Sequence, residues 1–262
     1  MENLRTIKWF VIYLCCGVLL VLPLFAFAYD DDTPHPALTQ ETIKFFNLEF
    51  EDLKISDENA EHIIQGSFDE DLGIRWMHHF YDPVYDRGLI FGKEWMSSKE
   101  WAQNTKAQAG FMDSAFAGTL KSYFGSKDDY SWERAIYEYA WRDKKIALEA
   151  LGHTLHLIQD ASVPDHTRND PHPPILDLGS PYEFWTRRFQ KNTITITLKK
   201  EPVILGTLNQ YFDSLATFSN NNFFSKETIA SIRYKSPQIT EKRTETLSDG
   251  KNYLFGYNQN IR

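Results

Sequence analysis

Apolar residues recur at helical spacing along most of the chain. Ile43 and Phe50 lie on one face of a helix predicted over residues 39–50. Thr39 is the expected N-cap of this helix, and Leu38 is placed to pack on Ile43 at its first turn. The same periodicity predicts further helices over residues 57–66, 98–124 with a break near Gly110, 132–141, 181–189, 207–218 and 225–232.

Residues 145–159 differ from these helices because they are apolar on nearly every side. A helix of this kind is expected to lie buried at the centre of a domain, and Pro164 is expected to end it. Residues 193–198 alternate threonine with isoleucine or leucine, which predicts a short strand. The pattern predicts a mainly α fold: a single-domain multi-helix bundle with a central buried helix and a small β element near the C-terminus.

The N-terminus has the pattern of a secretory signal peptide. Two basic residues precede an apolar run over residues 9–28, which ends in Ala-Phe-Ala just before an acidic segment. We therefore expect residues 1–28 to be removed, leaving Tyr29 as the first residue of a secreted or periplasmic protein. The alternative is an N-terminal membrane anchor, because the apolar run is long enough to span a bilayer.

Length and composition fit one globular domain over residues 29–262. About 230 residues would remain after the leader, enough for one sizeable core. Aromatic residues make up 15% of the chain, which argues against disorder. Residues 192–262 are assigned with less support, because the tail from about Ser236 has few core signals; this leaves open that a longer protein has been cut here.

Charge and cysteine content limit the chemistry. The net charge of −8 disfavours a diffuse basic surface for long nucleic acid, whereas a small phosphoester remains compatible because a bound metal supplies positive charge. Both cysteines, Cys15 and Cys16, lie in the apolar N-terminal run. Any metal in the remaining chain must therefore be held by His, Asp, Glu or backbone groups.

The candidate chemistry is concentrated at the end of the central helix. His156 and Asp160 are four residues apart and project from one helical face, where an imidazole and a carboxylate can share or bridge zinc ions. Such a pair alone is more often a helix pair or cap, but an ionised Asp160 on a buried helix requires a partner. His166 follows just after Pro164. His153, one turn earlier, is expected to support a ligand or to belong to the core.

At this point the chain resembles the zinc-dependent phospholipase C family, which shares its fold with the P1/S1-type nucleases. The first motif is His156-x3-Asp160-x5-His166, with an interior Val-Pro. The second is the run His-Phe-Tyr-Asp-Pro at residues 79–83, preceded by Gly-Ser-Phe-Asp-Glu-Asp at residues 66–71. An early histidine, His35, is a weaker third match. The order and spacing agree over about residues 29–190.

The resemblance implies three zinc ions in the cleft of a helical domain. The ligands implied are Asp71, His79 and His156 for one ion, Asp160 as the bridge from it to a second, His35 and Tyr29 for that second ion, and His166 and Glu183 for the third. Tyr29, as the first residue of the mature chain, would bind the second ion through its amino and carbonyl groups.

Two positions depart from the family pattern. The family's first residue is typically Trp, and here it would be Tyr29, which is tolerable because the backbone provides the ligands. The family also places a histidine four residues before the glutamate, where this chain has Gly179. His172 or Asp170 is a possible substitute; otherwise the third site is weak.

Neighbouring residues compete for two of the ligand positions. His78 is an alternative to His79, although the motif favours His79. Asp69 and Glu70 are alternatives to Asp71, which the preceding Gly-containing segment favours.

The resemblance implies a secreted phosphodiesterase in which Asp71 orients or deprotonates the attacking water. A phospholipase C that hydrolyses phosphoglycerides, with transient contact to a membrane surface, is the first expectation. One alternative is a P1/S1-like single-strand nuclease, which the negative charge weakly disfavours. The other is a secreted metal-binding protein without turnover, suggested by the glycine at position 179.

Overall fold

The computed structural model describes residues 34–72, 75–112, 129–172, 180–189, 202–247 and 250–258. It confirms a mainly helical fold with a small antiparallel sheet near the C-terminus. The α-helices are α2 (Pro34–Glu49), α3 (Asp57–Asp69), α4 (Ser98–Trp101), α5 (Thr105–Met112), α7 (Trp132–Trp141), α8 (Lys144–Asp160), α9 (Pro164–Thr167), α11 (Pro181–Thr186) and α12 (Leu208–Asn222). The 3-10 turns are η2 (Glu51–Leu53), η3 (Arg75–His78) and η4 (Lys226–Thr228), and the strands are β1 (Ile90–Phe91), β2 (Lys93–Glu94), β3 (Glu241–Thr246) and β4 (Asn252–Tyr257).

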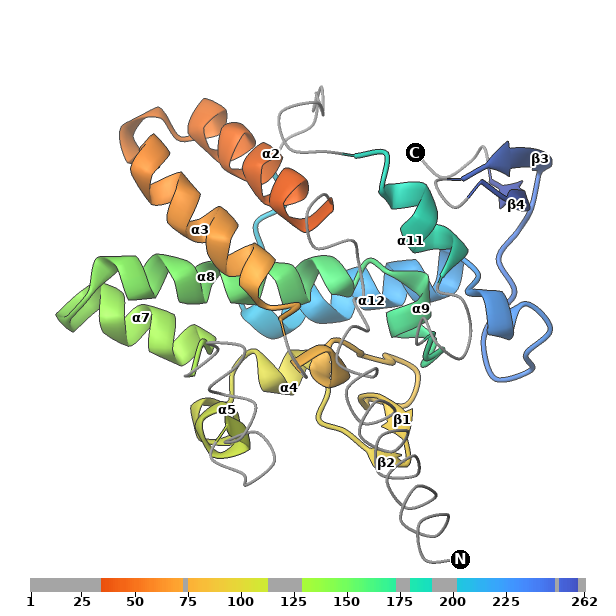
Figure 1. The fold of residues 1–262 in the computed structure, drawn as a ribbon, viewed down its shortest axis with the longest axis horizontal. Coiled ribbons are helices and arrows are strands. Elements are labelled where there is room, and N and C mark those ends of the chain that lie inside the picture. The colour runs from red at the N-terminus through yellow and green to blue at the C-terminus, as the bar shows by residue number, and fades with distance from the viewer. Residues whose placement is uncertain are drawn as a thin grey trace, which may run out of the picture.

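Helix α8 is the central helix, as predicted. It runs through the middle of the molecule, with α3 on one side, α7 on another and α12 alongside (Figure 1). The side chain of Asp143 caps its first turn by accepting hydrogen bonds from two backbone amides. Apolar residues of α8 pack in two directions, Leu148 against α3 and Leu157 against α12.

Two glycines let α3 and α8 cross at very short distance. A Cβ atom on Gly66 of α3 would lie 2.0 Å from the carbonyl oxygen of Glu149, and one on Gly152 of α8 would lie 2.1 Å from that of Ile63. Any larger residue at either position would push the helices apart. This close contact matters because α8 carries His156 and Asp160, and Asp71 follows the end of α3.

The start of α2 differs from the prediction. The helix begins at Pro34, not after a Thr39 N-cap. A proline in the first helical turn costs little, because the amide hydrogens of that turn have no partner within the helix. Thr39 is instead buried in mid-helix, where its hydroxyl donates to Ser67 Oγ at 2.9 Å. Leu38, Thr39 and Ile43 all lie within α2, so the predicted N-cap and the predicted packing of Leu38 on Ile43 at the first turn are wrong.

Other predicted boundaries hold to different degrees. Residues 132–141 form α7 as predicted, whereas α3 runs through Gly66 to Asp69. The helix predicted over residues 98–124 is broken earlier than Gly110, between α4 and α5, and residues 113–128 lie outside the described part. Helix α8 ends at Asp160, and Pro164 starts α9 instead of ending α8.

The C-terminal part is also helical first and then extended. Helix α12 starts with a capping box between Thr207 and Gln210. The helix predicted over residues 225–232 is only the short turn η4. Strands β3 and β4 pair antiparallel, with Glu241 opposite Tyr257, in the tail where few core signals had been found. The strand predicted at 193–198 lies outside the described residues.

No helix in the described ranges has the length and apolar content needed to cross a bilayer. The apolar residues 9–28 and Tyr29 lie outside these ranges, so the signal peptide, its cleavage and the anchor alternative stay predictions.

Candidate metal centre

The C-terminal half of α8 turns polar side chains toward the interior. His156 and Asp160 are one turn apart and have no solvent exposure. His156 Nε2 lies 3.3 Å from an oxygen of Asp160. The helical spacing that suggested a shared function therefore does bring the two groups together.

Four other segments bring residues to the same place. They are the first turn of α2, the residue pair after the end of α3, the residue after η3, and the short helix α9. We call the resulting set the central cluster, and all its side chains are buried. The central cluster consists of His35, Asp71, His79, His156, Asp160 and His166.

Asp160 is the centre of this arrangement, because each of its oxygens faces two imidazoles. Oδ2 lies 3.1 Å from His79 Nδ1 and 3.3 Å from His156 Nε2. Oδ1 lies 3.1 Å from His166 Nδ1 and 3.5 Å from His35 Nε2. Both oxygens of this buried carboxylate therefore lie among imidazoles of the kind that bind metal ions.

Asp71 completes the side of the cluster that contains His79 and His156. Its Oδ1 lies 3.5 Å from His79 Nδ1 and 3.5 Å from His156 Nε2. Two ligand atoms at the usual zinc distance in a tetrahedral site lie about 3.3 Å apart. The spacings in the cluster therefore fit donor atoms that surround an ion.

Hydrogen bonding gives a second test of fit. Within the described part of the chain, the buried Nε2 of His156 and both oxygens of Asp71 and of Asp160 have no hydrogen-bond partner. The same holds for both ring nitrogens of His79 and of His166. Buried polar atoms are rarely left without a partner, and one accepted explanation is an ion. The residues of the cluster can hold a metal ion.

Neighbouring acceptors fix which nitrogen faces the cluster. His156 Nδ1 donates to the carbonyl of Ser67 at 2.6 Å, and His35 Nδ1 donates to Gln159 Oε1 at 2.7 Å. In the neutral form of each ring the hydrogen is then on Nδ1, so Nε2 is the nitrogen that can act as a ligand in the cluster. Gln159 also donates to Thr39, which ties α2 to α8 beside the site.

The charges of the cluster stabilise one another. Burial would raise the pKa of Asp160, but the imidazoles of His166, His79 and His156 hold it well below its usual range. Burial would lower the pKa of His156, but the carboxylates of Asp71 and Asp160 raise it well above its usual value. The carboxylate of Asp160 is therefore ready to bind a cation, which would replace the proton on Nε2 of His156.

A second set of ligand-type residues lies next to the central cluster. We call His166, His172 and Glu183 the outer group. Glu183 Oε1 lies 2.6 Å from His172 Nε2 and 3.9 Å from His166 Nε2. His172 Nδ1 donates to the carbonyl of Asp170 at 2.9 Å, so its Nε2 faces the group. His172 thus stands beside Glu183, while Gly179 lies outside the described residues.

Helix α11 positions Glu183 through its N-cap. Ser180 Oγ accepts from the amide of Glu183 and donates to Asp165 Oδ2 at 2.9 Å. Burial raises the pKa of Glu183 to about 7. Burial alone would lower the pKa of His172, but Glu183, Asp165 and the carbonyl of Asp170 together raise it to about 10. His172 is 7% exposed and Glu183 5%, against 0–1% in the central cluster, so the outer group is nearer to solvent.

The competing residues have other partners. His78 stacks on Trp101, with ring centroids 4.0 Å apart, and donates to the carbonyl of Met96. Asp69 accepts from Gln65 on the exposed side of α3. Of the neighbouring candidates, His79 and Asp71 belong to the central cluster, which agrees with the motif.

Glu70 has a distinct position that the sequence did not indicate. Its carboxylate accepts hydrogen bonds from Arg75 Nε at 2.8 Å and from His153 Nδ1 at 2.5 Å, and it lies 3.8 Å from His79 Nε2. Burial would raise its pKa, but Arg75 and His153 hold it well below its usual range. His153 therefore supports this buried carboxylate, which lies behind a cluster histidine. No local pattern predicts that Arg75 would be buried.

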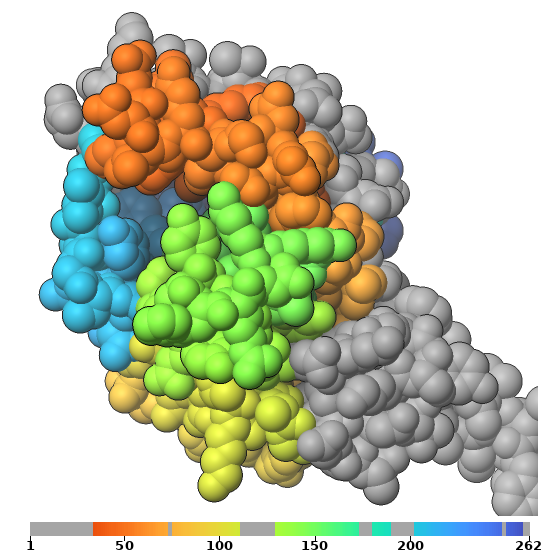
Figure 2. Space-filling view, turned by 90° about the vertical axis from the view of Figure 1, so that its left-hand side faces the viewer, coloured from red at the N-terminus to blue at the C-terminus, as the bar shows by residue number. Residues whose placement is uncertain are grey.

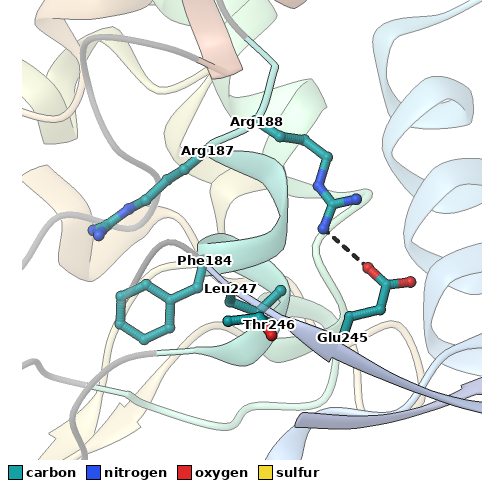
Figure 3. Close-up of a pocket in the computed structure, with 6 residues that line it drawn as sticks. All are labelled: Phe184, Arg187, Arg188, Glu245, Thr246 and Leu247. Carbon is teal, nitrogen blue, oxygen red and sulfur yellow. Dashed lines mark hydrogen bonds and ion pairs between the residues drawn. The ribbon is translucent and has the colours of Figure 1, made fainter. Parts of the chain in front are cut away.

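A pocket of about 630 Å³ lies between α11 and β3. It is lined by Phe184, Arg187, Arg188, Glu245, Thr246 and Leu247, and Arg188 pairs with Glu245 at 3.0 Å (Figure 3). None of these residues belongs to the central cluster or the outer group. We therefore assign the metal-binding chemistry to the clusters and not to this pocket.

Comparison with known proteins adds no relative to these observations. No protein-family model matches the chain, and no curated protein matches it significantly. The inference about its chemistry therefore depends on the site geometry and on the motifs in the sequence.

Proposed function

We propose that the protein is a zinc-dependent phosphoric diester hydrolase. The observation that carries this proposal is the bridging position of Asp160, whose two oxygens each face two buried imidazoles at 3.1–3.5 Å. A buried site of this composition suits zinc, because imidazole and carboxylate are common zinc ligands. We propose two ions at the central cluster, with Tyr29 completing the second, and a third at the outer group.

The chemistry that zinc supplies when bound is a lowered pKa of the attacking water and charge neutralisation at the phosphoryl oxygens. Asp71 holds a carboxylate 3.5 Å from both His79 and His156, where it would orient that water and accept its proton. The Ser67 carbonyl and Gln159 fix the imidazoles of His156 and His35 in one tautomer. Glu183 and His172 would serve the leaving-oxygen side, which is the side nearer to solvent.

A phospholipase C acting on phosphoglycerides is the substrate class that we favour. It is supported by the resemblance of the His-Phe-Tyr-Asp-Pro motif, in which His79 faces the cluster, and by the net charge of −8. The position of His172 beside Glu183 weakens the argument for a protein without turnover, because a histidine is available where the glycine left a gap. Secretion and transient contact with a membrane surface belong to the same proposal.

A paired assay tests this function. The secreted protein is incubated with phosphatidylcholine and, separately, with single-stranded DNA, with and without a zinc chelator. We expect release of phosphocholine that the chelator and Asp71→Asn both abolish. Cleavage of DNA alone would favour a nuclease, and hydrolysis that survives chelation would contradict the proposal. Asp129→Asn is the matched control, because Asp129 is a buried carboxylate that caps the amide of Ser131.

A further inference from the structure

Helix α7 carries four of its large apolar side chains on the face that points to solvent. Its inward face is formed by Ala135 and Glu138, which are buried. A surface helix normally turns its apolar stripe toward the core and its polar residues outward. In α7 this order is reversed. The exposed fractions are 51% for Ile136, 45% for Tyr137, 66% for Tyr139 and 79% for Trp141.

The inward face of α7 does not depend on these aromatic side chains. Glu138 accepts from the amide of Asp143 at 3.1 Å and pairs with Arg134 at 2.7 Å, so its buried carboxylate is neutralised locally. Ala135 allows close packing against α8. Among the outward residues Tyr137 accepts a hydrogen bond from Arg142 Nε at 3.1 Å, which keeps Arg142 beside this face. The outward face can therefore meet a partner without loss of the contacts that hold α7 in place.

A group of cations lies at the end of the apolar face. Arg142, Lys144 and Lys145 are all exposed at the turn from α7 into α8, directly after Trp141. Lys145 Nζ lies 3.8 Å from Glu149 Oε1, and the carboxylate of Asp143 accepts from the first amides of α8. Residues 142–145 carry three positive charges and one negative charge, so this turn is locally positive in a chain whose net charge is −8.

This combination has the chemistry of a membrane interface. Trp and Tyr prefer the boundary between lipid headgroups and acyl chains, and Lys and Arg reach outward to the headgroups. Cations beside such a face are attracted by anionic lipids. We infer that the outward face of α7, with the cations at its C-terminal end, docks on a lipid bilayer that contains anionic headgroups. Figure 2 shows this end of the molecule facing the viewer, with α7 and the start of α8 in green at the front.

A second copy of this chain fits the face less well. A two-fold contact places the same patch of both subunits against each other, and with the two α7 helices parallel the cations at Arg142, Lys144 and Lys145 would face their own copies. A bilayer with anionic headgroups instead supplies the opposite charge. The observations therefore favour a lipid surface as the occupant.

The docking face is remote from the metal centre. It lies at the first residues of α8, and Asp160 is the last of the 17 residues of that helix, about 24 Å further along at the helical rise per residue. Changes on α7 are therefore expected to leave the central cluster intact. This makes the inference independent of the proposed hydrolysis.

Co-sedimentation with lipid vesicles tests the inference. The sample is the secreted protein, and its first residue is identified in every variant. This shows whether the apolar residues 9–28, which could bind lipid themselves, are absent or are the same in all samples. Vesicles are made of phosphatidylcholine with and without phosphatidylglycerol. We expect wild type to bind, and the double variant Tyr139→Ser/Trp141→Ser to bind roughly tenfold or more weakly, because the buried apolar area is lost.

Two further variants separate the components of binding. Lys144→Gln/Lys145→Gln should weaken binding to phosphatidylglycerol vesicles by roughly fivefold per lysine at low salt, and high salt should remove this difference. Ile232→Ser, at a fully exposed apolar residue elsewhere, is the matched control and should bind as wild type does.

Three results would overturn the inference. They are no binding of wild type to phosphatidylglycerol vesicles, binding of the aromatic variant equal to wild type, and loss of a dimer in that variant without loss of vesicle binding. Zinc content and hydrolysis of a water-soluble phosphodiester should not change in any of these variants. A wild-type protein without hydrolysis would count against the proposed function and not against docking.

Discussion

Replacing Asp160 with asparagine keeps the size of the side chain but removes the charge that the cluster surrounds. In the structure both oxygens of Asp160 face imidazoles, two at each oxygen. If each oxygen serves one ion, Asp160→Asn removes a ligand from both. Loss of a supporting partner alone weakens metal binding by about 10–100-fold, so we expect at least about 100-fold here.

The size of the effect on stability follows from mass action. At a free zinc concentration about 100 times the dissociation constant, binding stabilises the folded protein by about 2.7 kcal/mol. For a chain of this size that corresponds to a rise in Tm of about 5–11 °C. A 100-fold weaker variant at the same zinc concentration would gain only about 0.4 kcal/mol, or about 1–2 °C.

The assay is thermal unfolding of both proteins with zinc and with a chelator. We expect the zinc-dependent rise in Tm to be large for wild type and nearly absent for Asp160→Asn, while Asp129→Asn keeps the wild-type rise. If Asp160→Asn retained the full rise, the bridging role of Asp160 would be refuted.

Three more predictions concern the surroundings of the cluster. His172→Ala should lower bound zinc by about one ion per chain, as metal analysis would show. It should lower turnover more than it lowers stability, as kinetics would show. Gly152→Ala should cost about 1–3 kcal/mol in urea unfolding, because the new Cβ meets the Ile63 carbonyl at 2.1 Å, whereas Gly110→Ala should not destabilise. Glu70→Gln should cost about 3–5 kcal/mol. Because the folded pKa of Glu70 is lowered, that difference should be complete above pH 4.5, its ordinary value, and should shrink progressively as the pH falls from there toward the folded pKa.

Much of the helical core could be predicted because its signals are local. Residues 132–141 and the buried character of α8 follow from apolar spacing alone. The start of α2 could not be predicted in this way. A threonine before an apolar run is a good N-cap, but here Thr39 is held inside the helix by Ser67 of α3 and Gln159 of α8, which are contacts between distant segments.

The ligand-type residues of the site could be named from motifs, but their supports could not. His156 and Asp160 are related by helical spacing, so their proximity can be read from the sequence. The roles of Glu70, Arg75 and Gln159 depend on tertiary contacts that no local spacing shows. The sequence indicates Glu70 only as an alternative ligand to Asp71, whereas in the structure Glu70 is the partner of Arg75 and His153.

Two buried carboxylates and four imidazoles are expected to bind metal ions at the central cluster, and metal analysis of the secreted protein measures this binding. The sample should be purified without added zinc, and its N-terminal residue should be determined by mass spectrometry. We predict two or three zinc ions per chain, with Tyr29 as the first residue. Less than one metal ion per chain in correctly folded protein would contradict the account.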